Sequence, residues 1–483
     1  MKVKRDGRHP AGPRGRERVL VSADVPAARV VSVVMLACVL GWSTVLVARQ
    51  YLGAGRVAPG RFGWSLALLA AVALIARGIF LGRPVTAGHA WAAAGAVAGG
   101  LCAHFLSFAL PGNLMVAGAG AVLMWPTASR PQPDLLAQVW ALVDATHADA
   151  LAPFAMHSSK SYFFNAEGSA AIAYRARLGL AVVSGDPIGD VARFDDLVDD
   201  FVRMCRERGW RIIVLAAGGR RLGLWRGGAV RSPVLSVPIG HDVVVDVARF
   251  SLRGRRFRNL RQAVQRTRNC GVSVEIVDEQ RLDGPLTAQL TEVLYAAHRA
   301  ARTERGFCMN LDGALQGRFP GIRLAIARDR GDRVVAFHRY ATAGHGSEIS
   351  LDVPFRRPDA PNGVDERLSV EMILAAQSSG AQRLSLAFAS FPEIFDAAHP
   401  SLAQRVAYRL IHLLDPLIRL ESLYRYLCKF HAVGERRYVV LCGRDIPAAL
   451  IVLLSLEFLP RPRRLRRGPN PAAAGRRTGS GDR

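Results

Sequence analysis

The sequence predicts an α-helical transmembrane segment followed by a soluble part of the α+β class. Residues 30–124 hold only a handful of charged side chains, whereas the chain from Pro131 onward has the mixed charge of a globular protein. In that second stretch, short apolar strand patterns alternate with helical patterns, which is typical of α+β units. A length of 483 residues suits two or three domains.

Four apolar runs predict about four transmembrane helices within residues 30–128. The first three approach the roughly 20 residues that a helix needs to cross the hydrocarbon core, and the fourth is shorter. Three spans are therefore the alternative to four. Arg77 falls inside the second run, where it either lies near a helix end or faces the interior of the bundle. The runs cover residues 30–48, 64–81, about 90–110 and 113–126.

The charge of the N-terminal tail predicts the orientation of these spans. Residues 1–29 carry eight basic side chains before the first span, and the positive-inside rule places such a tail in the cytoplasm. Four spans then return the soluble part to the cytoplasm, which predicts a multi-pass protein of the cell membrane. The seven cysteines form no CxxC pair, which fits a reduced compartment. The basic tail at 461–483 is interpreted either as a contact for anionic lipid or as a solubilising tail.

The soluble part is predicted to form two successive α+β units, at 131–285 and 286–460. In the second unit, residues 329–332 form the turn of a hairpin. The expected strands are 180–184, 211–216, 272–277, 322–328, 334–341, 347–352, 383–389 and 437–442. The expected helices are 193–208, a segment around Phe257, Leu260 and Val264, 294–303 and 364–379.

Residues 251–268 carry seven arginines along one predicted helix. Arg258 lies opposite the apolar stripe of this helix, and Arg261 lies close to it, so Arg261 could reach into a site at the domain surface. Such a row of charge suits a polyanion, either tRNA phosphates or lipid headgroups. The alternative is a solvated face in a chain that uses arginine widely.

Several motifs that identify common enzyme classes are missing from the full sequence. It contains no GxxxxGK[ST] phosphate loop, no HExxH and no GxSxG, which disfavours nucleotidases, zinc proteases and ordinary hydrolases. No cofactor and no metal site is indicated. The chain has only four lysines, at positions 2, 4, 160 and 429. Where such a chain keeps a lysine in its soluble part, the position could require an ammonium rather than a guanidinium.

Five segments resemble one known family in their order along the chain. They are FNAEGSAAIAYRARLGLAVVSGDPIGD at 164–190, IGHDVVVDVARFSLRGRRFRNLR at 239–261, ERGF at 304–307, LDVPFRRPDAPNG at 351–363 and YLCKFHAVGERRY at 426–438. Over roughly residues 145–450 the chain is similar to the C-terminal synthase domain of the lysyl- and alanyl-phosphatidylglycerol synthases, the multiple peptide resistance factor family.

The resemblance implies a fold and an activity. The fold is a tandem pair of acetyltransferase-like (GNAT-like) domains with the active site near their junction. The implied enzyme is an aminoacyltransferase that moves an aminoacyl group from aminoacyl-tRNA to phosphatidylglycerol and so modifies the charge of the membrane lipid. Its partners would be aminoacyl-tRNA and the anionic membrane, both of which suit a net charge of +25.

The resemblance also suggests catalytic residues. Asp352 could hold the α-ammonium of the aminoacyl group or transfer a proton, and the alternative is a structural pair with Arg356 or Arg357. Glu304 is a second candidate for the ammonium. The Gly185-Asp186-Pro187 segment is interpreted as a turn that shapes the first unit, with a catalytic site as its alternative.

The expected substrate-binding residues lie on the other motif positions. Lys429 could bind a phosphate as a point charge, or it could be a surface lysine of a helix. Asn362 is expected to cap the helix at 364–379, whose start is also a place for an anion. Lys160, Arg356 and Arg437 complete the predicted set. Asp352 and Lys429 are expected to share one site near the junction of the units.

Two other functions remain open on the sequence alone. One is aminoacyl or acyl transfer to a different acceptor, such as a peptidoglycan precursor or a small amine. The other is a catalytically silent membrane scaffold that binds anionic lipid. Departures from the family pattern favour the second, for example Phe355 where the family has arginine, while Lys160, Lys429, Asp352 and Arg437 favour an enzyme.

Overall fold

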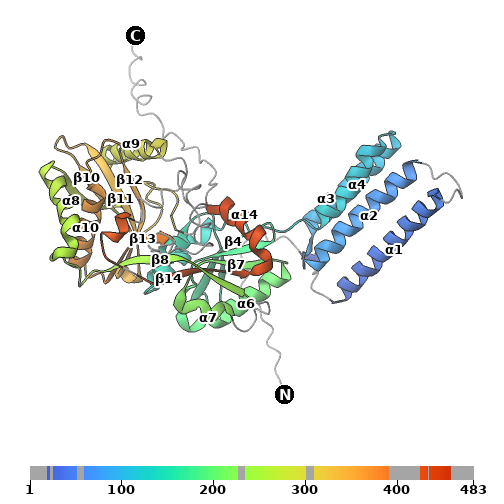
Figure 1. Ribbon diagram of the computed structural model, residues 1–483, viewed down its shortest axis with the longest axis horizontal. Coiled ribbons are helices and arrows are strands. Elements are labelled where there is room, and N and C mark those ends of the chain that lie inside the picture. Colours follow the sequence, from blue (N-terminus) through green and yellow to red (C-terminus); the bar gives the residue numbers. More distant parts are fainter. Residues whose placement is uncertain are drawn as a thin grey trace, which may run out of the picture.

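The structure separates a bundle of N-terminal helices from a larger part built around one sheet (Figure 1). It is a computed structural model that describes residues 19–21, 26–51, 59–226, 234–300, 309–390, 425–432 and 434–457. Figure 1 shows the four helices of the bundle side by side, with one end of the bundle directed toward the sheet.

The four helices run alternately up and down. They are α1 (Pro26–Tyr51), α2 (Pro59–Phe80), α3 (Ala87–Phe105) and α4 (Ala109–Leu123). A short ladder between β1 (Val19–Val21) and β2 (Val85–Thr86) brings the start of α1 to the α2–α3 connection. The Arg83 guanidinium donates to the carbonyl oxygen of Met124 at 3.0 Å, so the end of α4 lies there as well. The N-terminal side of the bundle and the exit to the soluble part therefore share one end.

Two of these helices meet the length and composition of a membrane span. They are the stretches Val30–Arg49 and Gly63–Phe80, while Ala109–Leu123 is apolar but shorter. Arg77 lies in the last turn of α2, which agrees with its predicted position near a helix end. Small residues bring the helices close: a side chain at Gly120 would begin 2.4 Å from the carbonyl oxygen of Ala71.

Within the described residues, one mixed sheet of twelve strands runs through the soluble part. Its order is β3-β4-β5-β7-β14-β8-β13-β12-β11-β10-β9, with β6 paired to β4. The strands are β3 (Ser161–Phe164), β4 (Ala170–Arg177), β5 (Leu180–Ser184), β6 (Ile188–Gly189), β7 (Arg211–Gly218), β8 (Val234–Asp246), β9 (Ser273–Asp278), β10 (Ile322–Arg328), β11 (Val334–Ala343), β12 (Glu348–Arg356), β13 (Arg383–Ser390) and β14 (Arg436–Cys442).

The two halves of the sheet share strands across the predicted boundary. Strand β14, from the end of the chain, pairs with β7 and β8, while β9, which precedes residue 285, pairs with β10. Each half has one parallel pair, β5 with β7 and β12 with β13. Domain boundaries near residues 131, 285 and 460 stay a prediction, and the strand order indicates that both units contribute to a continuous sheet.

Helices cover both faces of this sheet. One face of the first half packs on α6 (Phe194–Glu207) and α7 (Leu222–Arg226), and its other face on α5 (Leu136–Asp144) and α14 (Ile446–Glu457). In the second half, α8 (Arg258–Asn269) and α10 (Val364–Ser378) cover one face and α9 (Gly284–Ala300) the other. Figure 1 shows these layers on either side of the strands.

Most expected elements of the soluble part are confirmed. Strands β5 and β10 have the predicted bounds, and the 329–332 turn joins β10 to β11. The Arg-rich segment differs, because a single 3-10 turn precedes α8 and the regular helix begins only at Arg258. Strands β3, β4, β6 and β8 and helices α5, α7 and α14 were missing from the prediction. The helix expected at 294–303 is α9, which begins ten residues earlier at Gly284, and residues 301–303 lie outside the described residues.

Candidate active site

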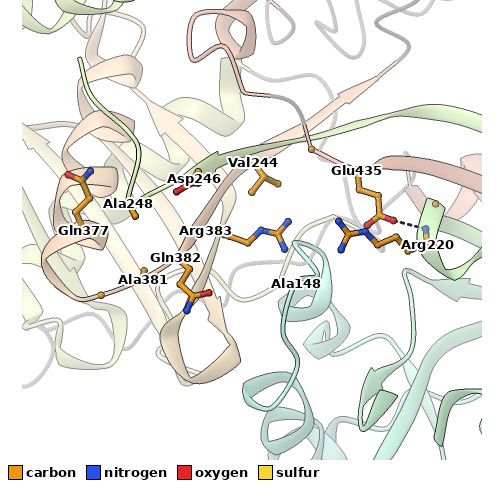
Figure 2. Close-up of a pocket in the computed structure, with 13 residues that line it drawn as sticks. Ala148, Arg220, Val244, Asp246, Ala248, Gln377, Ala381, Gln382, Arg383 and Glu435 are labelled. Atoms are coloured by element: carbon orange, nitrogen blue, oxygen red, sulfur yellow. Dashed lines mark hydrogen bonds between the residues drawn. The ribbon is translucent and has the colours of Figure 1, made fainter. Parts of the chain in front are cut away.

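An open cleft lies where the two halves of the sheet meet (Figure 2). It has a volume of about 1200 Å³. The end of β8 and the start of β13 form one wall, and in the ladder Asp246 pairs directly with Arg383. The loops around Ala148, Arg220 and Glu435 form the opposite side. The cleft is therefore assembled from segments nearly 290 residues apart in the chain.

Two arginines and two carboxylates, those of Asp246 and Glu435, line this cleft. Figure 2 shows the side chains of Arg383 and Arg220 pointing toward each other. The Glu435 carboxylate accepts a hydrogen bond from the backbone amide of Arg220 at 2.7 Å. On the β12 side, the Arg383 Nε lies 3.8 Å from a carboxylate oxygen of Glu348. Two guanidinium groups facing one space are a suitable arrangement for binding a phosphate or another anion.

A buried arginine with three aspartates lies beside the cleft. Arg437 is 1% exposed. Its guanidinium is 2.6 Å from Asp149 Oδ1, 2.7 Å from Asp242 Oδ2 and 3.2 Å from Asp186 Oδ2. Asp149 follows Ala148, which lines the cleft. We call this set, Arg437 with Asp149, Asp186 and Asp242, the Arg437 cluster.

The Arg437 cluster has more acidic than basic groups. Burial raises the pKa of Asp186 to about 7, and the neighbouring Asp149 carboxylate raises it further than Arg437 lowers it. Burial also raises the pKa of Asp242. One oxygen of Asp149 is buried and has no hydrogen-bond partner among the described residues. Three carboxyl groups and one guanidinium therefore lie next to the cleft, where a cationic group on a ligand would favour the ionised form of the carboxyl groups and be attracted by it.

A second buried arginine organises the other half of the sheet. Arg339 of β11 is fully buried and contacts Asp352 at 2.7 Å and Glu279 at 3.0 Å. Asp352 also accepts a hydrogen bond from the Leu311 backbone amide at 2.8 Å. The ladder between β11 and β12 pairs Arg339 with Val353 and Tyr340 with Leu351, so Asp352 is the extra residue of a β-bulge.

The predicted partners of Asp352 are wrong. Arg356 contacts Asp365 at 3.2 Å and Arg357 contacts Glu292 at 2.7 Å, whereas Asp352 pairs with Arg339. Burial raises the pKa of Asp352 to about 6, against the opposing effect of Arg339. The side chain of Asp352 is fully buried. Its contacts therefore favour the alternative in which Asp352 is a structural residue paired with an arginine.

Replacing Asp352 with asparagine is expected to lower stability rather than catalysis. The amide keeps the size of the side chain but removes the charge that faces buried Arg339, which costs about 1–3 kcal/mol. Thermal unfolding of the full chain in detergent measures this loss, and Glu279→Gln, on the other side of Arg339, should give a similar one. Unchanged stability with a rate that falls by about 10²–10⁴ would instead establish Asp352 as a catalytic base.

Asp352 and Lys429 do not share a site. The His338 ring lies 3.1 Å from Asp365 of α10, so the side chain of His338 points to the α10 face of the sheet. Arg339 is the next residue of the strand, and neighbouring strand residues point to opposite faces, so Arg339 points away from α10. Lys429 contacts Glu366, also of α10, at 2.5 Å. Lys429 therefore lies on the α10 face of the sheet, whereas Asp352, which pairs with Arg339, lies on the opposite face. The shared-site prediction is wrong for this geometric reason.

The α10 face instead holds a connected set of polar side chains. Asp365 contacts Arg356 and His338, and the His338 ring is 3.2 Å from the Tyr340 hydroxyl. Ser369 lies within hydrogen-bonding distance of the hydroxyls of Tyr340 and Tyr426. Asn362 is exposed and does not cap α10, because the N-cap residue is Gly363, with φ +98° and no side-chain hydrogen bond.

The remaining predicted site residues have different environments. Lys160 is fully buried and donates to the Phe154 carbonyl oxygen at 2.7 Å and to Ser184 at 2.6 Å, so it faces the core rather than a substrate. Arg437 is buried as well and pairs with three aspartates. Arg258 and Arg261 are exposed on α8. Glu304 lies outside the described residues.

Sequence reasoning missed the cleft residues Arg220, Arg383 and Glu435. Arg220 and Arg383 are two of many arginines, and no local pattern distinguishes them. Glu435 and Asp242 could have been predicted as site residues, because both belong to segments that resemble the synthase family. Asp186 belongs to such a segment too, and its interpretation as part of a structural turn agrees with its hydrogen bond from the Gly218 amide.

Comparison with known proteins identifies the family. The model of the phosphatidylglycerol lysyltransferase C-terminal family matches residues 140–441. An MprF-like domain protein of Mycobacterium tuberculosis (strain ATCC 25618 / H37Rv) is 59% identical over 453 residues, which cover 94% of each chain. The lysylphosphatidylglycerol biosynthesis bifunctional protein LysX of Mycobacterium ulcerans is 31% identical over 348 residues, 69% of this chain. The match covers 31% of the length of that LysX.

Two solved structures share the fold. One is described as the C-terminal domain of a lysylphosphatidylglycerol synthetase from Agrobacterium fabrum, with a TM-score of 0.58, 22% identity and coverage of 68% of this chain and 98% of that chain. The other is L-PGS from Bacillus licheniformis, with a TM-score of 0.56, 19% identity and the same coverage. The predicted fold, apolar helices followed by tandem GNAT-like units, is confirmed. The chain belongs to the family of phosphatidylglycerol lysyltransferase C-terminal domains.

Proposed function

We propose that this chain is a membrane-bound aminoacyltransferase that moves an aminoacyl group from aminoacyl-tRNA to phosphatidylglycerol. The observation that carries the proposal is the family match over residues 140–441, because that span contains every residue that lines the cleft. The cleft supports it chemically, since it combines anion-binding arginines with a neighbouring excess of carboxylates.

The proposed reaction exchanges one ester for another. A hydroxyl oxygen of the lipid glycerol attacks the carbonyl carbon of the aminoacyl ester, and the new C–O bond replaces the bond to the ribose oxygen of the tRNA. The glycerol hydroxyl loses a proton and the ribose oxygen gains one. Neither oxidation nor an external energy source is needed, so positioning and proton transfer are what the protein has to supply.

The cleft residues can be assigned to these tasks. Arg220 and Arg383 would hold a phosphate between them. Glu435 borders the same space and would accept the proton of the glycerol hydroxyl, which requires a carboxylate within hydrogen-bonding reach. The carboxyl groups of the Arg437 cluster outnumber its one guanidinium, and their ionised forms would attract the α-ammonium that the aminoacyl group carries. In this scheme Arg437 itself is a positioning residue, because it touches no substrate.

The exposed face of α8 supports tRNA as the donor. Arg258, Arg261 and Arg266 are exposed along this helix. Arg261 donates to the carbonyl oxygens of Leu252 and Gly254, the latter at 2.6 Å, and so holds the approach to the helix in place. A row of solvent-accessible arginines binds a phosphate backbone mainly by charge, without base recognition.

The bundle supports a multi-pass location with the soluble part in the cytoplasm. Helices α1–α4 alternate in direction, and the Met124 carbonyl contact of Arg83 places the end of α4 beside the start of α3. An even number of crossings would return the chain to the side of its basic tail, which the positive-inside rule assigns to the cytoplasm. The substrates, a tRNA and an inner-leaflet lipid, meet on that side.

Direct transfer tests the proposal. The full chain is reconstituted in vesicles that contain phosphatidylglycerol and is given tRNA charged with a mixture of labelled amino acids. The expected result is a labelled lipid whose mass equals phosphatidylglycerol plus one aminoacyl residue. Vesicles of phosphatidylcholine alone serve as the matched control, because they lack the glycerol hydroxyl and should give no such lipid.

Other outcomes distinguish the alternatives. Label in a water-soluble product with no labelled lipid would mean transfer to a different acceptor. No label in any product other than free amino acid, with the chain folded and α8 binding vesicles, would support a silent lipid-binding scaffold. Either outcome overturns the proposed acceptor.

A further inference from the structure

Helix α14 presents an exposed face made entirely of apolar side chains. No polar side chain occurs between Ile446 and Leu454. The exposed fractions are 49% for Ile446, 58% for Leu450, 62% for Ile451 and 37% for Leu454. The opposite face is packed in the core, with Val452 only 1% exposed. A helix that is apolar all round is normally covered on every side, so half of α14 lacks cover among the described residues.

The start of α14 is tied to the edge of the soluble part that meets the helix bundle. Asp445, the residue before the helix, pairs with Arg211 at 2.5 Å. Arg211 begins β7, directly after a turn that packs on the end of α2. At that turn a side chain on Gly209 would begin 2.3 Å from the carbonyl oxygen of Gly82. This close approach of two backbones places the start of α14 at the junction with the bundle.

The other end of α14 is tied to the same edge. The Ser455 hydroxyl accepts a hydrogen bond from Arg177 at 3.3 Å. Arg177 ends β4, and the following turn brings Gly179 against Pro126, just beyond α4. Leu178 in this turn is itself 46% exposed. Figure 1 shows α14 along the side of the sheet that is next to the near end of the bundle.

Positive charge surrounds this apolar face. Arg444 precedes the helix with its side chain 70% exposed, and Arg177 is exposed beside its end. In the sequence, five arginines follow the helix between residues 461 and 467. Apolar faces flanked by basic residues are typical of helices that lie on the surface of an anionic bilayer. A protein partner would more often present an apolar face with a polar rim of both charges.

We propose that α14 lies in the plane of the membrane, with its exposed face in the boundary between headgroups and acyl chains of an anionic bilayer. Its 12 residues span about 18 Å, at 1.5 Å per residue. Together with the bundle, α14 fixes the tilt of the soluble part by a second contact with the same membrane. This inference concerns membrane contact alone and does not depend on the transfer reaction.

Photo-cross-linking of the full chain tests the inference. Benzoylphenylalanine replaces Ile451 in protein reconstituted into nanodiscs of phosphatidylglycerol and phosphatidylcholine. The matched control carries it in place of Leu374, which is 37% exposed on α10 in the other half of the sheet. After illumination, mass spectrometry should find phospholipid adducts at position 451 and several-fold fewer at position 374.

The identity of the adduct decides the outcome. Adducts between position 451 and another segment of the same chain, or dimers cross-linked through position 451, would show a protein occupant and overturn the proposal. Equal lipid labelling at both positions would overturn it too. If the Ile451 replacement lowers the thermal unfolding midpoint, benzoylphenylalanine is placed at Leu450 instead, and the lipid adducts at position 450 are compared with those at position 374.

Discussion

Replacing Arg437 with methionine is expected to lower the free energy of unfolding by about 3–5 kcal/mol. The guanidinium is 1% exposed and is the shared partner of Asp149, Asp186 and Asp242. Methionine fills a similar volume but leaves three carboxyl groups in a buried space without their cation. Chemical unfolding of the full chain in detergent, followed by tryptophan fluorescence, measures the change.

Two matched variants show whether charge is the cause. Arg436→Met on the same strand changes an exposed arginine and should alter stability by no more than about 0.5 kcal/mol. Adding Asp186→Asn and Asp242→Asn to Arg437→Met should recover part of the loss, because fewer buried charges then lack a partner. Equal losses for Arg436→Met and Arg437→Met would contradict the electrostatic explanation.

The pH dependence of stability gives a further control on this cluster. Burial raises the pKa of Asp186 to about 7, so between about pH 4 and 7 the folded protein binds a proton that the unfolded chain releases. The contribution of Asp186 is therefore most favourable at the acid end of this window and is lost as the pH rises through 7. Asp186→Asn should flatten this slope, since an amide does not titrate.

Local pattern was sufficient for most of the soluble fold. The run at 322–328 is short, apolar and followed by Asp329-Arg330-Gly331-Asp332, and the strand and hairpin form there as expected. Strand β8 escaped prediction because Pro238 and Gly240 interrupt its pattern. It forms nevertheless, because β14 on one side and β13 on the other satisfy its backbone. Tertiary pairing here overrides the local signal.

The candidate site was less predictable because its contacts are distant in sequence. Arg437 and Asp149 are 288 positions apart, and no periodicity connects them. Asp186, Asp242 and Arg437 each fall in a different segment that resembles the family, although Asp242 was not predicted as a site residue, and only the sheet order shows that the three meet. Lys160 was predicted to bind substrate because lysines are rare in this chain and it falls near a family motif, but its buried ammonium donates to two core oxygens instead.

The separation of Asp352 from Lys429 shows the same limit. Asp352 and Lys429 both matched motif positions, yet alternation along β11 and the bulge at Asp352 place them on opposite faces of the sheet. A motif match can identify candidate residues, but the register of the strands determines which of these residues are in contact. That register depends on pairing partners that come from elsewhere in the chain.

Loss of either cleft arginine is expected to reduce transfer strongly. Arg220→Gln and Arg383→Gln should each lower kcat/KM by about 10–100-fold, because a charge-assisted hydrogen bond to phosphate contributes about 1.5–3 kcal/mol. The measurement is the initial rate of labelled lipid formation, normalised to folded protein because Arg383 also lies near buried Glu348. Arg281→Gln is the matched control, since its side chain is 83% exposed on the far edge of the sheet and pairs only with nearby Asp278 in the described contacts.

The kinetic pattern identifies which phosphate the arginines hold. If they bind the lipid, KM for phosphatidylglycerol should rise while KM for aminoacyl-tRNA stays constant, and the reverse holds if they bind the tRNA. Arg383→Lys keeps the charge but loses the planar fork, so its activity should lie between that of Arg383→Gln and the unaltered chain. Rates for both glutamine variants equal to that of Arg281→Gln would place the reaction outside this cleft. The assignment of Glu435 as proton acceptor would then lose its basis too, because Glu435 was assigned by its position beside Arg220.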